Sequence, residues 1–325
     1  MAAIDAIKAP IKEEMKFFEG YFRKSMKSKV PLLDVIMNYL LRRKGKQMRP
    51  ILVFLSSRLM EDRIHEQSYT AASLIELLHT ATLVHDDVVD EAYERRGFFS
   101  IKALWKSKIA VLVGDYLLAQ GLLLAVKNKS YQLLEIVSQA VKEMSEGELL
   151  QIQKSRSLDI TEEVYFDIIR KKTAALIAAC TASGAHAAGC NQEDLEKMHS
   201  FGEKLGIAFQ IKDDLFDYQA KNKVGKPTGN DIREKKMTLP LIYALHQSSA
   251  SERKKMLRLI KKHHKNGKKV REVIAFVKEK AGLDYAEQTM MKYKEEAVDI
   301  LQEFHPGPAR EALEKLADYV VERKK

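Results

Sequence analysis

Apolar residues recur every three or four positions along most of this chain, which is the period of an amphipathic helix. Clear examples are residues 73–84, SLIELLHTATLV, and residues 109–126, IAVLVGDYLLAQGLLLAV. The second segment is apolar on nearly every side, so it predicts a helix at the centre of a helical core. Glycine and proline gather beside basic residues at 45–50, 95–100 and 225–231, and we expect the helices to break there.

The composition excludes an all-β protein and predicts an all-α fold. The 325 residues include only 15 glycines and 7 prolines, and residues 51–226 contain no proline at all, which a turn-rich sandwich or barrel would not tolerate. With 46% hydrophobic residues the chain can bury a full core. Because the sequence has no repeat of fixed period and no Ser/Gly linker, we expect a single helical domain over residues 1–325.

Charge and cysteine usage narrow the class of protein further. Lysine and arginine outnumber aspartate and glutamate by 55 to 45, which favours anionic ligands. Cys180 and Cys190 are too few for a disulfide scaffold and have no zinc-type spacing, which is typical of a reducing compartment. Residues 1–16 lack the apolar core of a secretory signal, and the uncharged run 173–192 is rich in small residues that favour helix packing over a membrane span. We therefore predict a cytoplasmic protein.

Residues 253–271, RKKMLRLIKKHHKNGKKVR, carry the strongest local charge, with ten lysines and arginines and no acid. The simplest interpretation is a solvated pair of helices joined near Asn266 and Gly267. Peripheral contact with a membrane surface is the alternative. Nucleic acid is not predicted as a partner, because the tract has no aromatic residue to stack on bases.

Two aspartate motifs with identical D-D-x-x-D spacing concentrate the chemistry: HDDVVDE at 85–91 and KDDLFD at 212–217. On a helix, residues four apart have Cβ atoms about 6 Å from each other, so the first and last aspartates of each motif share a face. Like charges held this close require a compensating cation, and ligands that offer only oxygen favour magnesium. The predicted ligands are Asp86, Asp87 and Asp90 in the first motif and Asp213, Asp214 and Asp217 in the second.

Basic residues stand at the predicted breaks, where they can grip phosphate oxygens. They are Lys46, Arg49, Arg95, Arg96, Lys226 and Lys236. Two metal-binding motifs and two sets of cations imply two polyphosphate substrates, one activated by metal and one only anchored. Departure of a metal-bound diphosphate leaves a carbocation, which needs an apolar cavity that excludes water.

The motifs from Gly45 to Pro240 closely resemble, in content and order, those of the trans-type isoprenyl diphosphate synthases. The resemblance implies an all-α homodimer whose helices surround a deep central cavity. It also implies condensation of an allylic diphosphate with isopentenyl diphosphate, with up to about three magnesium ions in each active site.

The resemblance carries roles onto individual residues. Asp86, Asp90 and Asp213 match the magnesium ligands for the allylic diphosphate, supported by Asp87, Asp214 and Asp217 and completed by Asp231. The allylic diphosphate itself would be bound by Arg95, Lys172, Lys226 and Lys236. The diphosphate of isopentenyl diphosphate would be bound by Lys46, Arg49, His79 and Arg96. Thr173 and Gln210 would direct oxygen dipoles toward the developing cation. Two departures are Gln151, where short-chain members often have aspartate, and Lys235, which replaces a common glycine.

Product length follows from the helix that precedes the first motif, because the growing chain must run alongside it. Ala81 and Thr82 stand five and four residues before Asp86, where short-chain synthases tend to place a bulky residue. Further back on that face lie Leu78, Leu77 and Leu74. These positions and the resemblance to bacterial long-chain synthases predict about six to ten isoprene units, for quinone side chains, with farnesyl or geranylgeranyl diphosphate as primer.

Four alternatives remain to be weighed. One is a shorter-chain synthase that makes geranylgeranyl or farnesyl diphosphate. A class I terpene cyclase usually lacks a second D-D-x-x-D motif, and a metal phosphohydrolase built on His85 and Asp86 would leave residues 213–217 unexplained. A non-catalytic subunit of a heteromeric synthase would be expected to have lost some aspartates or cations, which this chain retains. A catalytic subunit that needs a partner stays open as an alternative.

Overall fold

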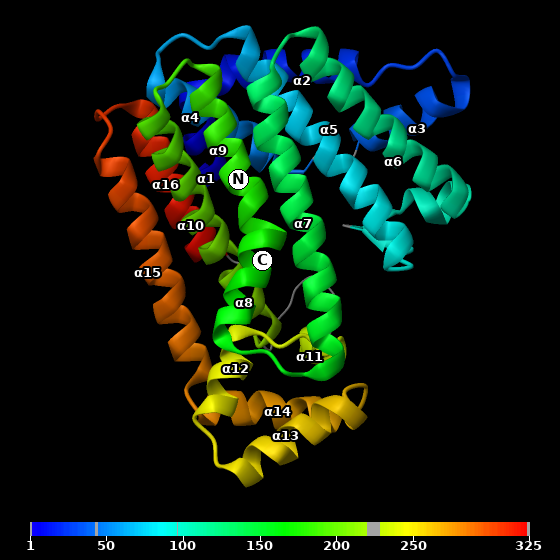
Figure 1. The fold of residues 1–325 in the computed structure, drawn as a ribbon, viewed down its shortest axis with the longest axis vertical. Coiled ribbons are helices and arrows are strands. Elements are labelled where there is room, and N and C mark those ends of the chain that lie inside the picture. Colours follow the sequence, from blue (N-terminus) through cyan, green and yellow to red (C-terminus); the bar gives the residue numbers. More distant parts are fainter. Residues whose placement is uncertain (1, 43–44, 96, 220–227, 324–325) are drawn as a thin grey trace. The chain divides into compact units, whose positions relative to one another are not determined.

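The computed structural model describes residues 2–42, 45–95, 97–219 and 228–323, and these are almost entirely helical (Figure 1). The all-α prediction is confirmed. In chain order the α-helices are α1 Ala2–Lys8, α2 Lys12–Ser25, α3 Pro31–Arg42, α4 Met48–Met60, α5 Glu66–Val89, α6 Ile101–Lys127, α7 Tyr131–Ser157, α8 Glu162–Ile169, α9 Ala175–Ala187, α10 Gln192–Asp217, α11 Asn230–Arg233, α12 Leu239–His246, α13 Ala250–His263, α14 Gly267–Glu279, α15 Gly282–Gln302 and α16 Pro308–Glu322. A 3₁₀ turn covers Ala9–Ile11, a π-helical turn covers Arg170–Ala174, and β1 Glu94–Arg95 pairs antiparallel with β2 Phe98–Phe99.

The chain divides into two compact units. Unit 1 comprises Met1–Val141, Ala179–His199 and Phe304–Leu313, and unit 2 comprises Lys142–Ala178, Ser200–Glu303 and Glu314–Lys325. Four of the boundaries fall inside α7, α9, α10 and α16, and the fifth falls between α15 and α16. Single-domain organisation stays a prediction.

The core of unit 1 lies between α5 and α6, which make the most extensive helix–helix contact in the described chain. A cluster of fully buried side chains joins them, including Leu77, Ala81, Val113 and Leu117. A Cβ added to Gly121 would stand 3.3 Å from Leu74 Cδ1, so α6 approaches α5 closely at that glycine. The 24 residues of α5 contain the predicted helical segment 73–84 and the start of the first aspartate motif, residues 85–89.

Helix α6 is less central than its sequence predicts. Its buried face packs on α5, but the other face exposes large apolar side chains, among them Val111, Leu112, Leu122 and Leu123. In the part of the chain that the structure describes, α6 is the one helix long and apolar enough to cross a membrane by length and composition alone, with 33% of that window buried. The continuous apolar pattern therefore reflects one face in the core and a second face left open in the single chain.

Within unit 2, α13 and α14 form a hairpin and lie side by side (Figure 1). Ser249 and Glu252 form a capping box at the start of α13, and the Asn266 side chain accepts hydrogen bonds from Lys268 N and Lys269 N at the start of α14. The basic tract is thus a pair of helices joined at Asn266, as its sequence predicts.

Unit 1 contains a close helix contact that can be tested by adding one methyl group. A Cβ on Gly184 of α9 would lie 2.2 Å from Val53 O of α4, so Gly184→Ala should lower the free energy of unfolding by about 1–3 kcal/mol. Gly20 in α2 has nothing within 4 Å of its added Cβ, so Gly20→Ala should raise it by about 0.5–1 kcal/mol. Chemical denaturation of both variants checks the sign, and a stabilising Gly184→Ala would contradict the close contact.

Candidate active site

The second aspartate motif occupies the last turns of α10. Buried Ile211, Leu215 and Phe216 fix this end of the helix in the core of unit 2. The same helical turn brings Asp213 and Asp217 to one side, as the four-residue spacing requires. Apolar residues thereby position the carboxylates at the wall of a pocket.

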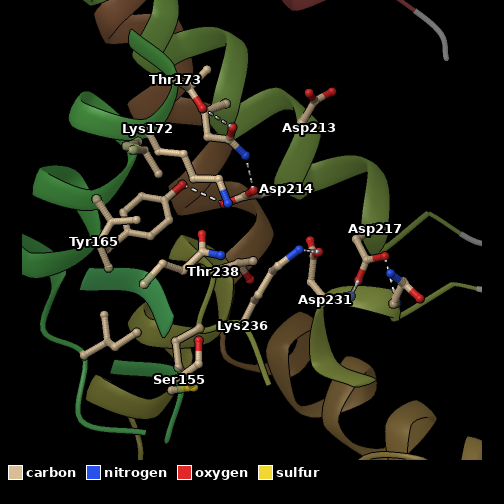
Figure 2. Close-up of a pocket in the computed structure, with 17 residues that line it drawn as sticks. Ser155, Tyr165, Lys172, Thr173, Asp213, Asp214, Asp217, Asp231, Lys236 and Thr238 are labelled. Carbon is tan, nitrogen blue, oxygen red and sulfur yellow. Dashed lines mark hydrogen bonds and ion pairs between the residues drawn. The ribbon is translucent and has the colours of Figure 1, made fainter. Parts of the chain in front are cut away.

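That pocket has a volume of about 390 Å³ and lies within unit 2 (Figure 2). Its lining includes eight residues that the sequence nominated, namely Lys172, Thr173, Gln210, Asp213, Asp214, Asp217, Asp231 and Lys236. They come from the π-helical turn, from α10, from α11 and from the segment between α11 and α12. Gln151 also lines the pocket, so the departure noted in the sequence changes the pocket wall itself.

Asp214 is the most buried carboxylate of the pocket and is held by two donors. The Tyr165 hydroxyl donates to its Oδ2 over 2.7 Å and Gln210 Nε2 donates to its Oδ1 over 2.9 Å. Burial, with Asp231 and Asp213 nearby, raises the pKa of Asp214 to about 7. Thr173 Oγ1 donates to Gln210 Oε1 over 2.8 Å, which extends the network to the π-helical turn (Figure 2). Tyr165 was not identified from the sequence, because a lone tyrosine carries no signal there.

Asp217 anchors the segment that begins at residue 228. Its carboxylate accepts hydrogen bonds from Asn230 N at 2.8 Å and from Asp231 N at 3.1 Å (Figure 2). The buried Tyr218 and Thr238 hydroxyls join at 2.6 Å and tie the end of α10 to the start of α12. These contacts bring Asp231 to the pocket.

Lys236 supplies positive charge to the pocket. Its Nζ lies 3.8 Å from Asp231 Oδ1 and 2.5 Å from Glu234 Oε2. Burial acts to lower the pKa of Lys236, but Asp231 and Glu234 outweigh it and the pKa is raised, so the lysine stays charged. Lys235 has φ of 60°, a left-handed conformation that suits glycine, which explains the residue type expected at this position.

Asp213 is paired with a residue that the sequence did not nominate. Arg323 Nη2 lies 2.7 Å from Asp213 Oδ1, and the guanidinium stacks 4.0 Å from the centre of the Phe209 ring. Arg323 lies at the end of the chain, within a run of charged residues that looks like a solvated terminus. Only the packing of the chain end against α10 reveals the contact.

Lys172 and Thr173 lie in the π-helical turn, an irregularity that is frequent at functional sites. Two glycines allow the turn its space: a Cβ on Gly147 would lie 2.8 Å from Lys172 N, and one on Gly206 would lie 2.5 Å from Ala174 Cα. Lys172 forms an ion pair with Glu148 of α7. Glu148 belongs to residues 147–151, GELLQ. The sequence shows its negative charge, but only the structure shows that it pairs with Lys172.

The first aspartate motif closes α5 in unit 1. Asp86 and Asp90 are exposed and one turn apart, since Asp90 N donates to Asp86 O at 2.8 Å, whereas Asp87 is buried. His85 packs on α6, where a Cβ on Gly114 would lie 2.1 Å from its Nε2, and His85 Nε2 is 3.3 Å from Asp115 Oδ1. The motif is therefore presented at a helix end that α6 supports.

A second group of predicted residues also lies in unit 1. Lys46 is exposed just before α4, and Arg49 lies in the first turn of that helix, where backbone N–H groups favour anions. Arg49 Nε donates to Glu76 Oε1 at 2.7 Å, and Glu76 stands one turn before the half-buried His79 on α5. The structure thus brings Arg49 and α5 together around Glu76, a residue that the sequence did not nominate.

Three predicted anion-binding residues fall outside what the structure describes: Arg96, Lys226 and the side chain of Arg95. The structure describes all five residues that the sequence assigned to product length. Ala81, Leu77 and Leu74 are fully buried, Leu78 is buried against α6, and Thr82 is half-buried.

The donor set of the pocket suits magnesium. In the described part of the chain, no group of three or more His, Cys, Asp or Glu side chains is already arranged to hold a metal ion. The four pocket aspartates nevertheless offer only carboxylate oxygens. Burial, together with repulsion from Asp231 and Asp213, raises the pKa of Asp214, so a divalent cation would relieve a cost that is present in the protein. Asp213, Asp214, Asp217 and Asp231 are the residues that would hold it.

The chain is also similar in sequence to known prenyl diphosphate synthases. The polyprenyl synthetase family model matches residues 30–277. The all-trans-nonaprenyl-diphosphate synthase (geranyl-diphosphate specific) of Rhodobacter capsulatus is 35% identical over 98% of this chain and 97% of its own. Octaprenyl diphosphate synthase of Escherichia coli is 35% identical over 96% of each chain, and heptaprenyl diphosphate synthase component 2 of Bacillus subtilis is 32% identical over 97% of this chain and 89% of its own.

Solved structures agree in fold over nearly the whole chain. A decaprenyl diphosphate synthase from Rhodobacter capsulatus superposes with a TM-score of 0.92 at 35% identity and covers 98% of each chain. A geranylgeranyl pyrophosphate synthase from Bacteroides thetaiotaomicron superposes with a TM-score of 0.84 at 39% identity and covers 99% of this chain and 100% of its own.

The raised pKa of Asp214 predicts how the metal-free protein responds to pH. Because burial raises this pKa from 3.8 to about 7, folding takes up a proton between those values, and stability must fall as pH rises through that window. Asp214→Asn should make stability depend less on pH, and it should raise the melting temperature at pH 8 by several degrees. Asp299→Asn, at an exposed position on α15, is the control and should leave the slope unchanged. Thermal melts in chelator from pH 5 to pH 8 make the measurement, and parallel wild-type and Asp214→Asn curves would contradict it.

Proposed function

Because this chain belongs to the polyprenyl synthetase family and is a trans-prenyl diphosphate synthase, we propose that it makes a long-chain polyprenyl diphosphate of about six to ten isoprene units. The resemblance recognised in the sequence is confirmed, as is the enzyme class, a prenyltransferase. The substrates of the family are isopentenyl diphosphate and an allylic diphosphate. We propose farnesyl or geranylgeranyl diphosphate as primer and quinone side chains as the use of the product.

The observation that carries the long product is the small size of Ala81 and Thr82 beside the first aspartate motif. We propose that these small side chains leave a path for the growing product along α5, which spans about 36 Å at 1.5 Å per residue. The nonaprenyl and octaprenyl synthases that resemble this chain support the same conclusion. A shorter product is the second candidate, since a geranylgeranyl pyrophosphate synthase is 39% identical.

We propose that magnesium bound by the two aspartate motifs activates the allylic diphosphate as a leaving group; this is the chemistry the metal supplies when bound. Asp86, Asp87 and Asp90 serve the first motif, and the pocket aspartates serve the second. Lys172 and Lys236 bind the leaving diphosphate in the pocket, with Arg95 and Lys226. Lys46, Arg49, His79 and Arg96 bind isopentenyl diphosphate, and Glu76 orients the Arg49 guanidinium through their ion pair.

The pocket network explains how the carbocation would be stabilised. Thr173 and Gln210 are hydrogen-bonded to each other, and Gln210 is hydrogen-bonded to Asp214, so their oxygens are fixed before the reaction begins. The double bond of isopentenyl diphosphate attacks the cation and forms the new carbon–carbon bond. Loss of a proton then restores a double bond, and we assign its acceptance to the departing diphosphate.

A homodimer in the cytoplasm is the proposed state of the enzyme. The exposed apolar side chains of α6 support a partner surface in unit 1, because such a face is costly to leave in water. The heptaprenyl synthase component of Bacillus subtilis favours a heteromeric assembly as the alternative. Family membership leaves the cyclase and phosphohydrolase interpretations without support.

Incubation of the purified protein with magnesium, isopentenyl diphosphate and farnesyl diphosphate tests the function directly. Mass spectrometry of the dephosphorylated products should show a ladder ending in a long polyprenol. Asp86→Ala should reduce turnover by about three orders of magnitude or more with an unchanged melting temperature, because it removes a proposed ligand of the magnesium that activates the leaving diphosphate. Asp299→Ala on α15 is the matched control and should retain activity.

The outcomes separate the candidates. Products that stop at geranylgeraniol would establish the shorter-chain alternative, and turnover that appears only on addition of a second protein would establish the heteromeric one. Full activity of Asp86→Ala would remove the metal assignment of the first motif.

Chain length should respond to bulk at Ala81. Ala81→Phe is expected to shorten the longest product without abolishing condensation, because it narrows the path beside α5 and leaves the diphosphate ligands untouched. Ala81→Ser keeps the side chain small at the same buried position and should preserve the length. Product analysis by mass spectrometry, with a thermal melt to verify folding, makes the comparison. A folded Ala81→Phe enzyme with the wild-type product would refute the path along α5.

A further inference from the structure

The α13–α14 hairpin presents positive charge that the proposed reaction does not use. Four cations on α13, Lys254, Arg258, Lys261 and Lys262, are all exposed, and we call them the basic stripe. At 100° per residue they fall within a sector of about 100° around the helix. The opposite side of α13 buries Met256, Leu259 and Ile260 in unit 2, so the stripe faces solvent along the helix.

The carboxylates of the hairpin neutralise other lysines. Glu252 forms an ion pair with Lys280 at 2.8 Å, and Glu272 forms ion pairs with Lys255 at 2.7 Å and Lys269 at 2.9 Å. These pairs lie beside the stripe, not within it. Lys265, Lys268 and Arg271, exposed in the connecting turn and on α14, extend the positive surface. The hairpin therefore offers several exposed cations on two capped helices.

We propose that the basic stripe docks the enzyme on the anionic surface of a lipid bilayer. Charge complementarity supports this partner, because clustered lysines and arginines on a helix bind anionic headgroups additively. Among the described residues, Ile152 is the last large apolar side chain in chain order that is exposed, so none is exposed on the hairpin. The hairpin therefore binds at the headgroups and does not insert. Binding is therefore electrostatic and sensitive to salt.

A nucleic acid is less well matched to the same face. The aromatic residue of the hairpin, Phe276, is buried, so the stripe offers no ring on which a base could stack. The choice of a membrane also rests on the proposed function, since a polyprenyl product is an amphiphile whose apolar chain partitions into a bilayer. Docking places the enzyme where its product is stored.

Sedimentation of the full-length protein with lipid vesicles tests the proposal without reference to activity. The protein should bind vesicles of phosphatidylcholine mixed with phosphatidylglycerol, should not bind phosphatidylcholine alone, and should be released as salt is raised. Replacing the four stripe residues by glutamine should weaken binding by at least about a hundredfold, because each cation at an anionic surface contributes roughly fivefold. Glutamine favours helix, so the fold should be kept.

A second variant provides a matched control. Helix α2 of unit 1 carries three exposed lysines and one exposed arginine, namely Lys12, Lys16, Arg23 and Lys24. Replacing these four by glutamine changes the net charge by the same amount and should leave vesicle binding as in the wild type. Equal losses in both variants, or binding to both kinds of vesicle alike, would overturn the proposal. So would tighter binding to duplex DNA or RNA than to anionic vesicles at the same salt, if the stripe variant loses it.

The same samples keep the two proposals apart. In the condensation assay without vesicles, the stripe variant should turn over as the wild type does. Vesicle binding by a protein that makes no polyprenyl product would leave the docking surface intact and refute the proposed function.

Discussion

Several carboxylates held close together in a partly buried pocket are the constraint on which unit 2 depends. Asp214 lies at the centre, and its raised pKa measures the cost of burying a charge beside Asp231 and Asp213. The fold offsets that cost with donors: the Tyr165 hydroxyl, the Gln210 amide and the Arg323 guanidinium. A divalent cation would take over part of this compensation. Stability and ligand binding are therefore coupled through the same few side chains.

Glycines let the chain bring these groups to the pocket. Gly147 and Gly206 leave room for the π-helical turn that carries Lys172 and Thr173, since either added Cβ would meet the backbone of that turn. In unit 1, Gly114 makes space for His85, which begins the first aspartate motif. Sites of this kind are precise because neighbouring helices fix the backbone, so a single methyl group in the wrong place would shift a functional side chain.

The exposed faces of α6 and α13 suit two different kinds of partner. Helix α6 exposes large apolar side chains, which suit another protein surface, whereas α13 exposes lysine and arginine on a polar face, which suit anionic headgroups. Each feature looks ambiguous as sequence. The apolar run of α6 predicts a central helix, and the basic tract predicts a solvated helix pair or a membrane contact. The structure shows which face of each helix is covered, and this is the basis for proposing a protein partner for α6 and a lipid surface for α13.

The sequence by itself determined the helical class, the helix carrying the first aspartates and the basic hairpin, because helical periodicity, capping residues and i, i+4 spacing act within a few residues of each other. It also nominated eight of the residues that line the pocket, since paired carboxylates and lysines have a recognisable chemistry wherever they lie. Only the tertiary structure decided that Asp217 anchors residues 230 and 231, that Tyr165 and Arg323 hold Asp214 and Asp213, and that Glu76 orients Arg49. Those contacts join residues 13 to 110 positions apart in the chain, and no local pattern encodes which distant donor a buried carboxylate will meet.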